Sequence, residues 1–284
     1  MKKIIMIILC IALMSVSVVS SQQSLQKNSI MSNQNNGENI SIFQGHNVFA
    51  EYVTATTCYM CPPASTALHD LDQSSTQPFS YVTLVFDVNK NAQNRGWYGY
   101  KTVAVPTVYF DGGFLNFVGK AETVNATMDE YQNLIEESNT RQTIKDITLQ
   151  TTATWNGDAE ISIQITITNN EQLPYIGFFK TYVAEITSRW NDFSGNPYHN
   201  AFLDFAINRP IVLLPKQTKT ITAQWDGKEN HNGISFPDIT QNNTMITSAV
   251  FHILPHMETG YITPQFTQKY VGFYADQSDI FTFE

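Results

Sequence analysis

Hydrophobic and polar residues follow two different patterns along this chain of 284 residues. Between about residues 45 and 140, short β-branched and aromatic runs alternate with helical patterns. From about residue 146 onwards, strand-like runs follow one another with no helical pattern between them. The pattern therefore predicts two domains, 45–140 and 146–284, with the boundary between them near residues 140–146.

The first segment shows strands and helices in alternation. Its last helix is predicted by apolar residues at helical spacing, and an earlier helix has a proline in its first turn, where proline is tolerated. The predicted elements, in chain order, are a strand at 47–54, a helix at 63–73, a strand at 81–88, a polar stretch with a short helix at 89–102, two strand-like runs around Asp111-Gly112-Gly113 within 106–119, and a helix at 121–140.

The second segment begins with strict alternation of apolar and polar residues over residues 146–168. Asn156-Gly157 lies in the middle of this stretch and is a type I′ turn signal, so we expect a β-hairpin. Regularly spaced strands predict an antiparallel β-sandwich. The further strands are expected at 178–187, 200–207, 219–225, 245–254 and 269–275.

The N-terminus has the pattern of a secretory signal peptide. Lys2 and Lys3 precede an apolar run that ends in small residues near Ser20, which predicts a signal peptide at 1–21. The alternative is an uncleaved membrane anchor, although the run is slightly short for a bilayer span. Residues 22–44 are rich in Gln, Asn and Ser and are expected to form a flexible leader. We therefore expect a secreted or extracytoplasmic protein.

Composition and charge exclude several classes of protein. The formal net charge is -9, and no basic run occurs after the first lysines, which argues against binding to nucleic acid or to anionic membranes. No later stretch is apolar enough to cross a bilayer, so no membrane span is expected once the signal is removed. No phosphate-binding loop, catalytic triad or pair of catalytic carboxylates is apparent, and no cofactor is predicted.

Two cysteines remain after removal of the signal peptide, which contains Cys10. Cys58 and Cys61 are separated by two residues and are compatible with a structural disulfide, half of a metal site or a redox pair. A bridge across two residues removes little chain entropy, so a structural role is disfavoured. Structural zinc needs four ligands, and the six histidines show no matching spacing, so no metal site is predicted.

The redox interpretation gives the two cysteines different roles. We expect Cys58 at the end of the first strand and the start of the next helix, where free N–H groups and the helix dipole stabilise a thiolate. Cys61 is expected one turn further into the helix and more deeply buried. Cys58 would then attack a substrate disulfide, and Cys61 would resolve the mixed disulfide.

Pro106 is the second feature of chemical interest. Proline provides no N–H to a strand ladder, and here it opens a predicted strand. A turn proline beside the cysteines, in the cis form, would be a deliberate feature of the site. An ordinary trans proline at a strand edge is the alternative.

Together these motifs resemble the thioredoxin superfamily. The resemblance rests on CYMC at 58–61, followed by VPT at 105–107, which leads into a strand, and by DGG at 111–113. It is closer to a secreted subgroup in which the thioredoxin-like domain is followed by an immunoglobulin-like sandwich. The resemblance implies an α/β thioredoxin-like domain, with a central mixed sheet flanked by helices, joined to an all-β immunoglobulin-like β-sandwich.

The resemblance also implies roles for individual residues. Cys58 would be the nucleophile and Cys61 the resolving thiol of a redox-active disulfide. Pro106 would be the cis-proline, and the backbone of Val105 would pair with a bound peptide as an added strand. Glu51 is the candidate for the buried acid that deprotonates the resolving cysteine.

The chain also departs from the family pattern. Tyr52, rather than Glu51, occupies the strict position of the family's buried acid. Thr57 replaces the usual tryptophan, and Tyr59-Met60 replaces Gly-Pro between the cysteines. Because the residues between the cysteines tune the redox poise, the direction of electron flow stays open.

The expected function is that of an exported thiol–disulfide oxidoreductase. Its partners would be protein or peptide thiols and disulfides, together with a further redox partner. The alternatives are a non-catalytic binding or adhesion protein and a protein that handles a soft metal ion. Asn39, Asn125 and Asn242 lie in glycosylation sequons, which matter only in a host that glycosylates exported proteins.

Overall fold

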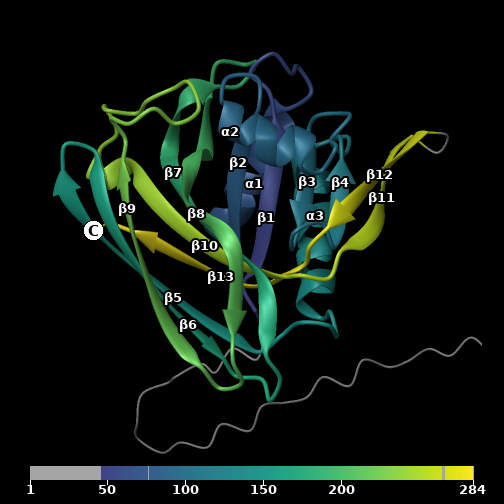
Figure 1. The fold of residues 1–284 in the computed structure, drawn as a ribbon. Coiled ribbons are helices and arrows are strands. Elements are labelled where there is room, and N and C mark those ends of the chain that lie inside the picture. The colour runs from purple at the N-terminus through teal and green to yellow at the C-terminus, as the bar shows by residue number, and fades with distance from the viewer. Residues whose placement is uncertain (1–45, 76, 264–265, 284) are drawn as a thin grey trace, which may run out of the picture. The chain divides into compact units, whose positions relative to one another are not determined.

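The structure, a computed structural model, describes residues 46–75, 77–263 and 266–283. The predicted signal peptide and leader, and with them Asn39, lie outside the described residues. One eight-stranded mixed sheet organises the described chain, with the strand order β13-β10-β7-β8-β2-β1-β3-β4 (Figure 1). A three-stranded sheet, β5-β6-β9, and the β11-β12 hairpin accompany it.

The elements have the following bounds. The helices and helical turns are α1 Pro62–Ser74, α2 Lys90–Ala92, the π-helical turn η1 Gln93–Tyr98, α3 Val124–Asn139 and the 3-10 turn η2 Gln241–Asn243. The strands are β1 Val48–Thr54, β2 Phe79–Val85, β3 Thr107–Phe110, β4 Leu115–Val118, β5 Ile147–Gly157, β6 Glu160–Asn169, β7 Tyr175–Asn191, β8 Pro197–Leu213, β9 Thr218–Asp226, β10 Thr244–His252, β11 His256–Thr263, β12 Phe266–Gly272 and β13 Ala275–Thr282.

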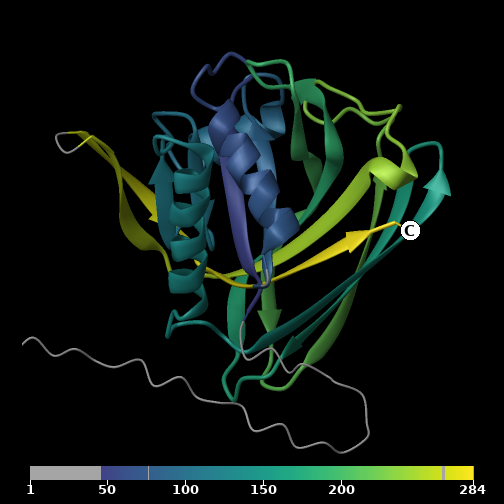
Figure 2. The ribbon, with the colours of Figure 1, turned by 180° about the vertical axis from the view of Figure 1, so that it is seen from behind.

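Strands β1 to β4 form one end of the large sheet, and α1 and α3 cover it. Strand β1 pairs in parallel with β2 and antiparallel with β3, so it is central and every one of its residues is buried. Figure 2 shows α1 and α3 in front of β1. Ala64 and Leu68 of α1 pack with Tyr52, and Thr123 caps α3 by accepting a hydrogen bond from the N–H of Ala126.

The other end of the large sheet packs against the β5-β6-β9 sheet. The alternating isoleucines of β6 are buried against apolar residues of β7, β8 and β10, as expected for two sheets that share a core. Their side chains point inwards at every second position, whereas the residues between them are partly or fully exposed. This core contains Ile161, Ile163, Ile165, Ile167, Phe179, Val183, Leu203 and Ile246.

The opposite face of the large sheet curves around a third apolar cluster. The ring centroids of Phe49 in β1 and Tyr182 in β7 are 5.2 Å apart. Strands β2 and β8 lie between β1 and β7 in the sheet, and adjacent strands are about 4.8 Å apart. A flat sheet would therefore separate the two rings by about three strand spacings. Their contact shows that the sheet bends so that distant strands share one core.

The predicted two-domain fold class is wrong. A thioredoxin-like α/β domain followed by an immunoglobulin-like sandwich would place β1–β4 and β7–β13 in separate sheets. Instead, β2 pairs in parallel with β8 through Thr83 and Ala201, and one sheet continues across both segments. The predicted sandwich therefore exists only as the packing of β5-β6-β9 on part of this shared sheet.

The β5–β6 hairpin is confirmed, but its turn lies further along the chain than predicted. Gly157 pairs with Glu160, so the two central turn residues are Asp158 and Ala159. Both have positive φ, 49° and 63°, as a type I′ turn requires. The ladder shifts register between Trp155 and Gly157, and this irregularity moves the turn past the Asn-Gly signal.

Because one sheet joins both ends of the described chain, we expect the protein to unfold in one cooperative step. The long helices α1 and α3 both precede residue 140, so the helical far-UV signal reports on that part. In a Trp97→Phe variant the remaining tryptophans are Trp155, Trp190 and Trp225, which report on the later strands. The two signals should show the same urea midpoint, whereas loss of the helical signal at lower urea would contradict a shared sheet.

Candidate functional site

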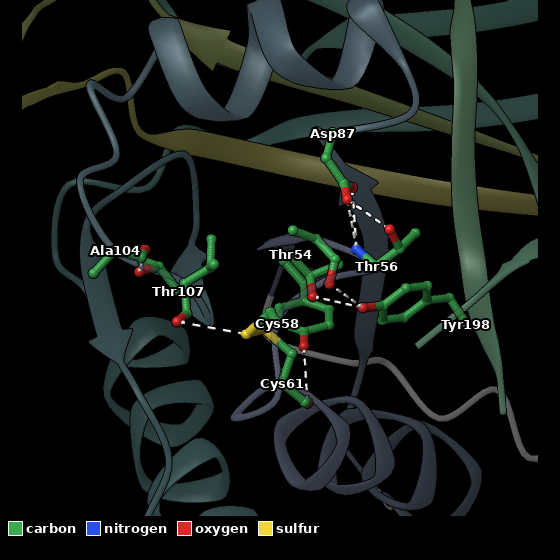
Figure 3. The surroundings of a disulfide bond; sticks show 11 residues. Thr54, Thr56, Cys58, Cys61, Asp87, Ala104, Thr107 and Tyr198 are labelled. Carbon is green, nitrogen blue, oxygen red and sulfur yellow. Dashed lines mark hydrogen bonds between the residues drawn. A yellow bond between two sulfur atoms is a disulfide. The ribbon is translucent and has the colours of Figure 1, made fainter. Parts of the chain in front are cut away.

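The cysteine pair lies in the turn that connects β1 to α1. Cys58 and Cys61 are joined by a disulfide with an S–S distance of 2.08 Å and a Cα–Cα distance of 5.4 Å (Figure 3). The turn is closed by two backbone hydrogen bonds, from the N–H of Cys58 to the carbonyl of Ala55 and from the N–H of Cys61 to the carbonyl of Cys58. The pair is thus held by an ordered turn between a buried strand and a helix.

The two cysteines differ in their access to solvent. Cys58 is partly exposed, whereas Cys61 is 0% exposed. Between them, Tyr59 is 73% exposed and Met60 is 37% exposed, so both side chains project away from the core. Of the two cysteines, Cys58 is therefore the one that a reactant can approach from solvent.

The position of the helix differs from the prediction. Helix α1 begins at Pro62, Cys61 is its N-cap residue, and Cys58 precedes the helix altogether. Cys61 is therefore not one turn inside the helix. Pro62 and Pro63 have no N–H, and the N–H of Cys61 is already bonded, so Ala64 has the only unused N–H at the start of this helix. The helix terminus offers a thiolate fewer donors than the sequence suggested.

The second predicted motif lies beside Cys58. The peptide bond between Val105 and Pro106 is cis, and the Cys58 sulfur is 3.7 Å from the carbonyl oxygen of Val105. In the disulfide form this sulfur has no proton to donate, so the approach is a packing contact. Among the described residues, neither the N–H nor the carbonyl of Val105 has a backbone hydrogen-bond partner. The next carbonyl, that of Pro106, is occupied, because it accepts from the N–H of Gly119.

Residues distant in sequence fix the turn that carries the cysteines. The hydroxyl of Tyr198 in β8 donates to the carbonyl of Ala55 at 2.9 Å and lies 3.0 Å from the Thr54 hydroxyl. On the other side, the carboxylate of Asp87 accepts from the N–H and the hydroxyl of Thr56. Burial raises the pKa of Tyr198 to about 12, so its hydroxyl remains a donor at neutral pH. Figure 3 shows Tyr198 and Asp87 directed at this turn.

Gln268 of β12 holds the loop that leads to Val105. Its side-chain amide donates to the carbonyls of Tyr100 and Lys101 at 2.9 and 2.7 Å, and its oxygen accepts from the N–H of Val103. Sequence reasoning missed Tyr198, Asp87 and Gln268. No local pattern marks them, because each acts on a partner that is distant along the chain.

Glu51, the proposed proton shuttle, faces away from the cysteines. Side chains alternate along β1, and Tyr52 is the one directed at the pair: its hydroxyl donates to the Cys61 carbonyl at 3.1 Å. Glu51 lies on the opposite face of the sheet, where it is fully buried. The strand therefore places Tyr52, not Glu51, next to Cys61. With no acid in that position, the structure gives no support to a proton-shuttle role for Glu51.

The carboxylate of Glu51 is fully occupied by three partners. Arg95 binds it through Nε and Nη2, at 2.7 and 2.5 Å, and the hydroxyls of Tyr100 and Tyr182 donate to it at 2.6 and 2.9 Å. Burial raises the pKa of Glu51, but the charge of Arg95 and the hydrogen bonds outweigh burial, so the pKa lies below the usual 4.5. Glu51 is a buried anion in a closed network.

Both asparagines of the described glycosylation sequons are exposed. Asn125 is exposed in the first turn of α3, and Asn242 is exposed in η2. Two histidines, His252 and His256, approach each other with their Nε2 atoms 3.2 Å apart. Across the residues that the structure describes, no group of three or more His, Cys, Asp or Glu side chains is arranged to hold a metal ion. In the same described part, no helix is long and apolar enough to span a membrane.

We expect Glu51→Gln to destabilise the protein by about 3–5 kcal/mol at neutral pH, because it leaves the buried charge of Arg95 without a counter-ion. Urea unfolding measures the loss, and Glu229→Gln, at an exposed position, is the matched control. A loss below about 1 kcal/mol, the range of exposed pairs, would contradict the role of Glu51.

The same ion pair predicts a pH dependence. The folded-state pKa of Glu51 is lowered, so its stabilisation is complete above the unfolded value of about 4.5 and is lost as the pH falls through the lower folded value. The stability gap between the wild type and Glu51→Gln should therefore shrink on acidification. A gap that stays constant or widens would show that ionised Glu51 is not its source.

The chain was compared with known proteins at three levels. No protein-family model matches it, and no curated protein matches it. Among solved structures, HBP35 of Porphyromonas gingivalis superposes with a TM-score of 0.59 at 11% identity, over 84% of this chain and 76% of that chain. At this identity the likeness concerns the fold alone.

Two further solved structures superpose less well. A protein of Agrobacterium tumefaciens has a TM-score of 0.42 at 16% identity, over 85% of this chain and 96% of that chain. A β-glucosidase of Listeria innocua has a TM-score of 0.29 at 14% identity, over 49% of this chain and 16% of that chain. Neither superposition is close enough to support an argument about fold or function.

Proposed function

We propose that this protein exchanges disulfides with protein or peptide substrates through Cys58 and Cys61. The observation that carries the proposal is the asymmetry of the pair: a partly exposed Cys58 is bonded to a fully buried Cys61. A disulfide that served only as a bridge would not need one of its cysteines to be exposed to solvent. Its short loop would also contribute little to stability.

The exchange proceeds in two displacements. In the oxidising direction, a substrate thiolate attacks the sulfur of Cys58, the Cys58–Cys61 bond breaks, and Cys61 leaves as a thiolate that takes up a proton. A second substrate thiolate then attacks the substrate sulfur of the mixed disulfide and releases Cys58. The substrate gains a disulfide and loses two electrons, which the cysteine pair receives. The cysteine pair is then in its dithiol form, and a separate redox partner must oxidise it back to the disulfide.

The backbone of Val105 is proposed to hold the substrate beside the attacked sulfur. Within the described residues, its N–H and carbonyl lack backbone partners, and the carbonyl oxygen lies 3.7 Å from the Cys58 sulfur. An extended peptide can pair with these groups as an added strand, in a manner that depends little on its sequence. The substrate class is therefore defined by a cysteine in an extended segment rather than by a particular side-chain motif.

We extend the proposal to family and location. The CYMC and VPT motifs lie side by side, as the resemblance to the thioredoxin superfamily implied, and the N-terminal residues have the pattern of an export signal. Export would suit this chemistry, because disulfides persist in oxidising compartments. The sandwich part of that resemblance is not carried over, because the large sheet is shared.

Cysteine variants provide the test. Cys61→Ser retains the attacking sulfur and lacks the resolving one, so it should accumulate a mixed disulfide with a substrate such as scrambled ribonuclease. Cys58→Ser, prepared like Cys61→Ser without the predicted signal peptide that contains Cys10, should form none, because its remaining cysteine, Cys61, is buried. Non-reducing electrophoresis and mass spectrometry identify the adduct. Insulin reduction by Cys58→Ser should fall to the uncatalysed rate.

The opposite outcome would favour a non-catalytic binding or adhesion protein. In that case Cys61→Ser traps no substrate. The reduction potential of the wild-type disulfide then lies below about −300 mV, as for structural bridges. A labile disulfide together with a trapped substrate supports exchange, and measurement of both properties separates the two functions.

A further inference from the structure

A second site lies on the face of the large sheet that is turned away from the cysteines. It is a pocket of about 240 Å³ beside η1, β7, β10 and β12. Two cationic side chains and four aromatic rings contribute to its lining: Arg95, Lys180, Tyr100, Phe178, Phe251 and Phe273. Because Arg95 is also the partner of Glu51, the pocket adjoins the buried ion pair.

The charges around the pocket do not cancel. Glu51 neutralises Arg95 through a bidentate contact, and the hydroxyls of Tyr100 and Tyr182 donate to the same carboxylate. Lys180 has no such partner: its ammonium donates to the Asn208 amide oxygen at 2.7 Å. Within the described part of the chain, it makes no ion pair with a carboxylate. One positive charge is thus left without a counter-ion.

The environment of Lys180 makes that charge unfavourable. Burial lowers the pKa of Lys180 to about 7; the positive charge of Arg95 acts in the same direction, and Glu51 opposes both. Phe205 and Phe251 lie under the ammonium, with their ring centroids 5.4 and 5.9 Å away. These rings replace part of its lost hydration, but they do not neutralise it.

The aromatic walls define the rest of the ligand. The guanidinium of Arg95 lies 4.5 Å from the ring centroid of Tyr100, and Phe178 and Phe273 meet edge to face at 5.1 Å. Flat apolar surfaces pack well against such rings. A single uncompensated cation favours a monoanion, because a dianion would bring a second charge that the pocket does not neutralise.

We propose that this pocket binds a small aromatic carboxylate, with the carboxylate paired to Lys180 and the apolar body packed against the phenylalanine rings. The site is independent of disulfide exchange, because it lies on the opposite face of β1 from the cysteine pair. Pockets of this kind, apolar with a few convergent polar groups, are the usual places for small ligands.

The test uses the full chain with its disulfide intact and benzoate as the probe, in isothermal titration calorimetry near pH 6, below the lysine pKa of about 7. Benzoate should bind saturably. Lys180→Met should weaken binding about tenfold or more, as expected for loss of a charged hydrogen bond. The matched control is Lys219→Met, an exposed lysine of β9, which should bind as the wild type does. Benzyl alcohol, which lacks the charge, should bind about tenfold more weakly than benzoate.

The wild type alone provides a second arm, in case Lys180→Met does not fold. A carboxylate favours the ammonium form of Lys180, so binding above pH 7 should take up a proton and should weaken as the pH rises further. Titrations in two buffers of different ionisation enthalpy measure this uptake. Equal affinity for benzoate and benzyl alcohol, absence of proton uptake, or unchanged binding by a folded Lys180→Met would each overturn the proposal.

Discussion

The buried carboxylate of Glu51 is the interaction on which the rest of the structure depends. A charge on a central strand is tolerated only if it is fully partnered, and its partners come from two distant parts of the chain. Arg95 and Tyr100 follow β2, whereas Tyr182 belongs to β7. To bring Tyr182 to Glu51, the sheet must bend through β2 and β8. The bend in the sheet therefore brings Tyr182 to Glu51 and completes the set of partners that the buried carboxylate needs.

The side chains of strand β1 alternate between the two faces of the sheet, so this one strand contributes residues to two sites. Glu51 faces the curved core and, through Arg95, the cationic pocket. Its neighbour Tyr52 faces the helices and holds the carbonyl of Cys61. Since all residues of β1 are buried, neither side chain can turn to the other face without breaking the core. The cysteine turn thus starts from a strand that is fixed on both faces.

Local features of the fold could be predicted from the sequence, and long-range ones could not. The helix α3, the β5–β6 hairpin and most later strands follow from spacing of three to four residues or from alternation. No local sequence pattern predicts the pairing of Thr83 with Ala201, because a buried strand looks the same in sequence whichever strand it pairs with. The predicted fold class was wrong for that reason. The cysteine and proline motifs were noticed because they are unusual in themselves. Adjacent side chains of a strand face opposite sides of the sheet, so Glu51 and Tyr52 could not both face the cysteines. This alternation can be read from the sequence, but the assignment of Glu51 did not take it into account.

The hydrogen bonds of Tyr198 and Gln268 have a consequence for how far this site can be transplanted. The turn that carries the disulfide and the loop that leads to Val105 are both held by hydrogen bonds from strands that come later in the chain. A segment excised around the two cysteines would carry both sulfur atoms but would lack the hydrogen bonds from Tyr198 and Gln268. The proposed exchange therefore depends on the whole sheet, and this segment alone would not confer it on another protein.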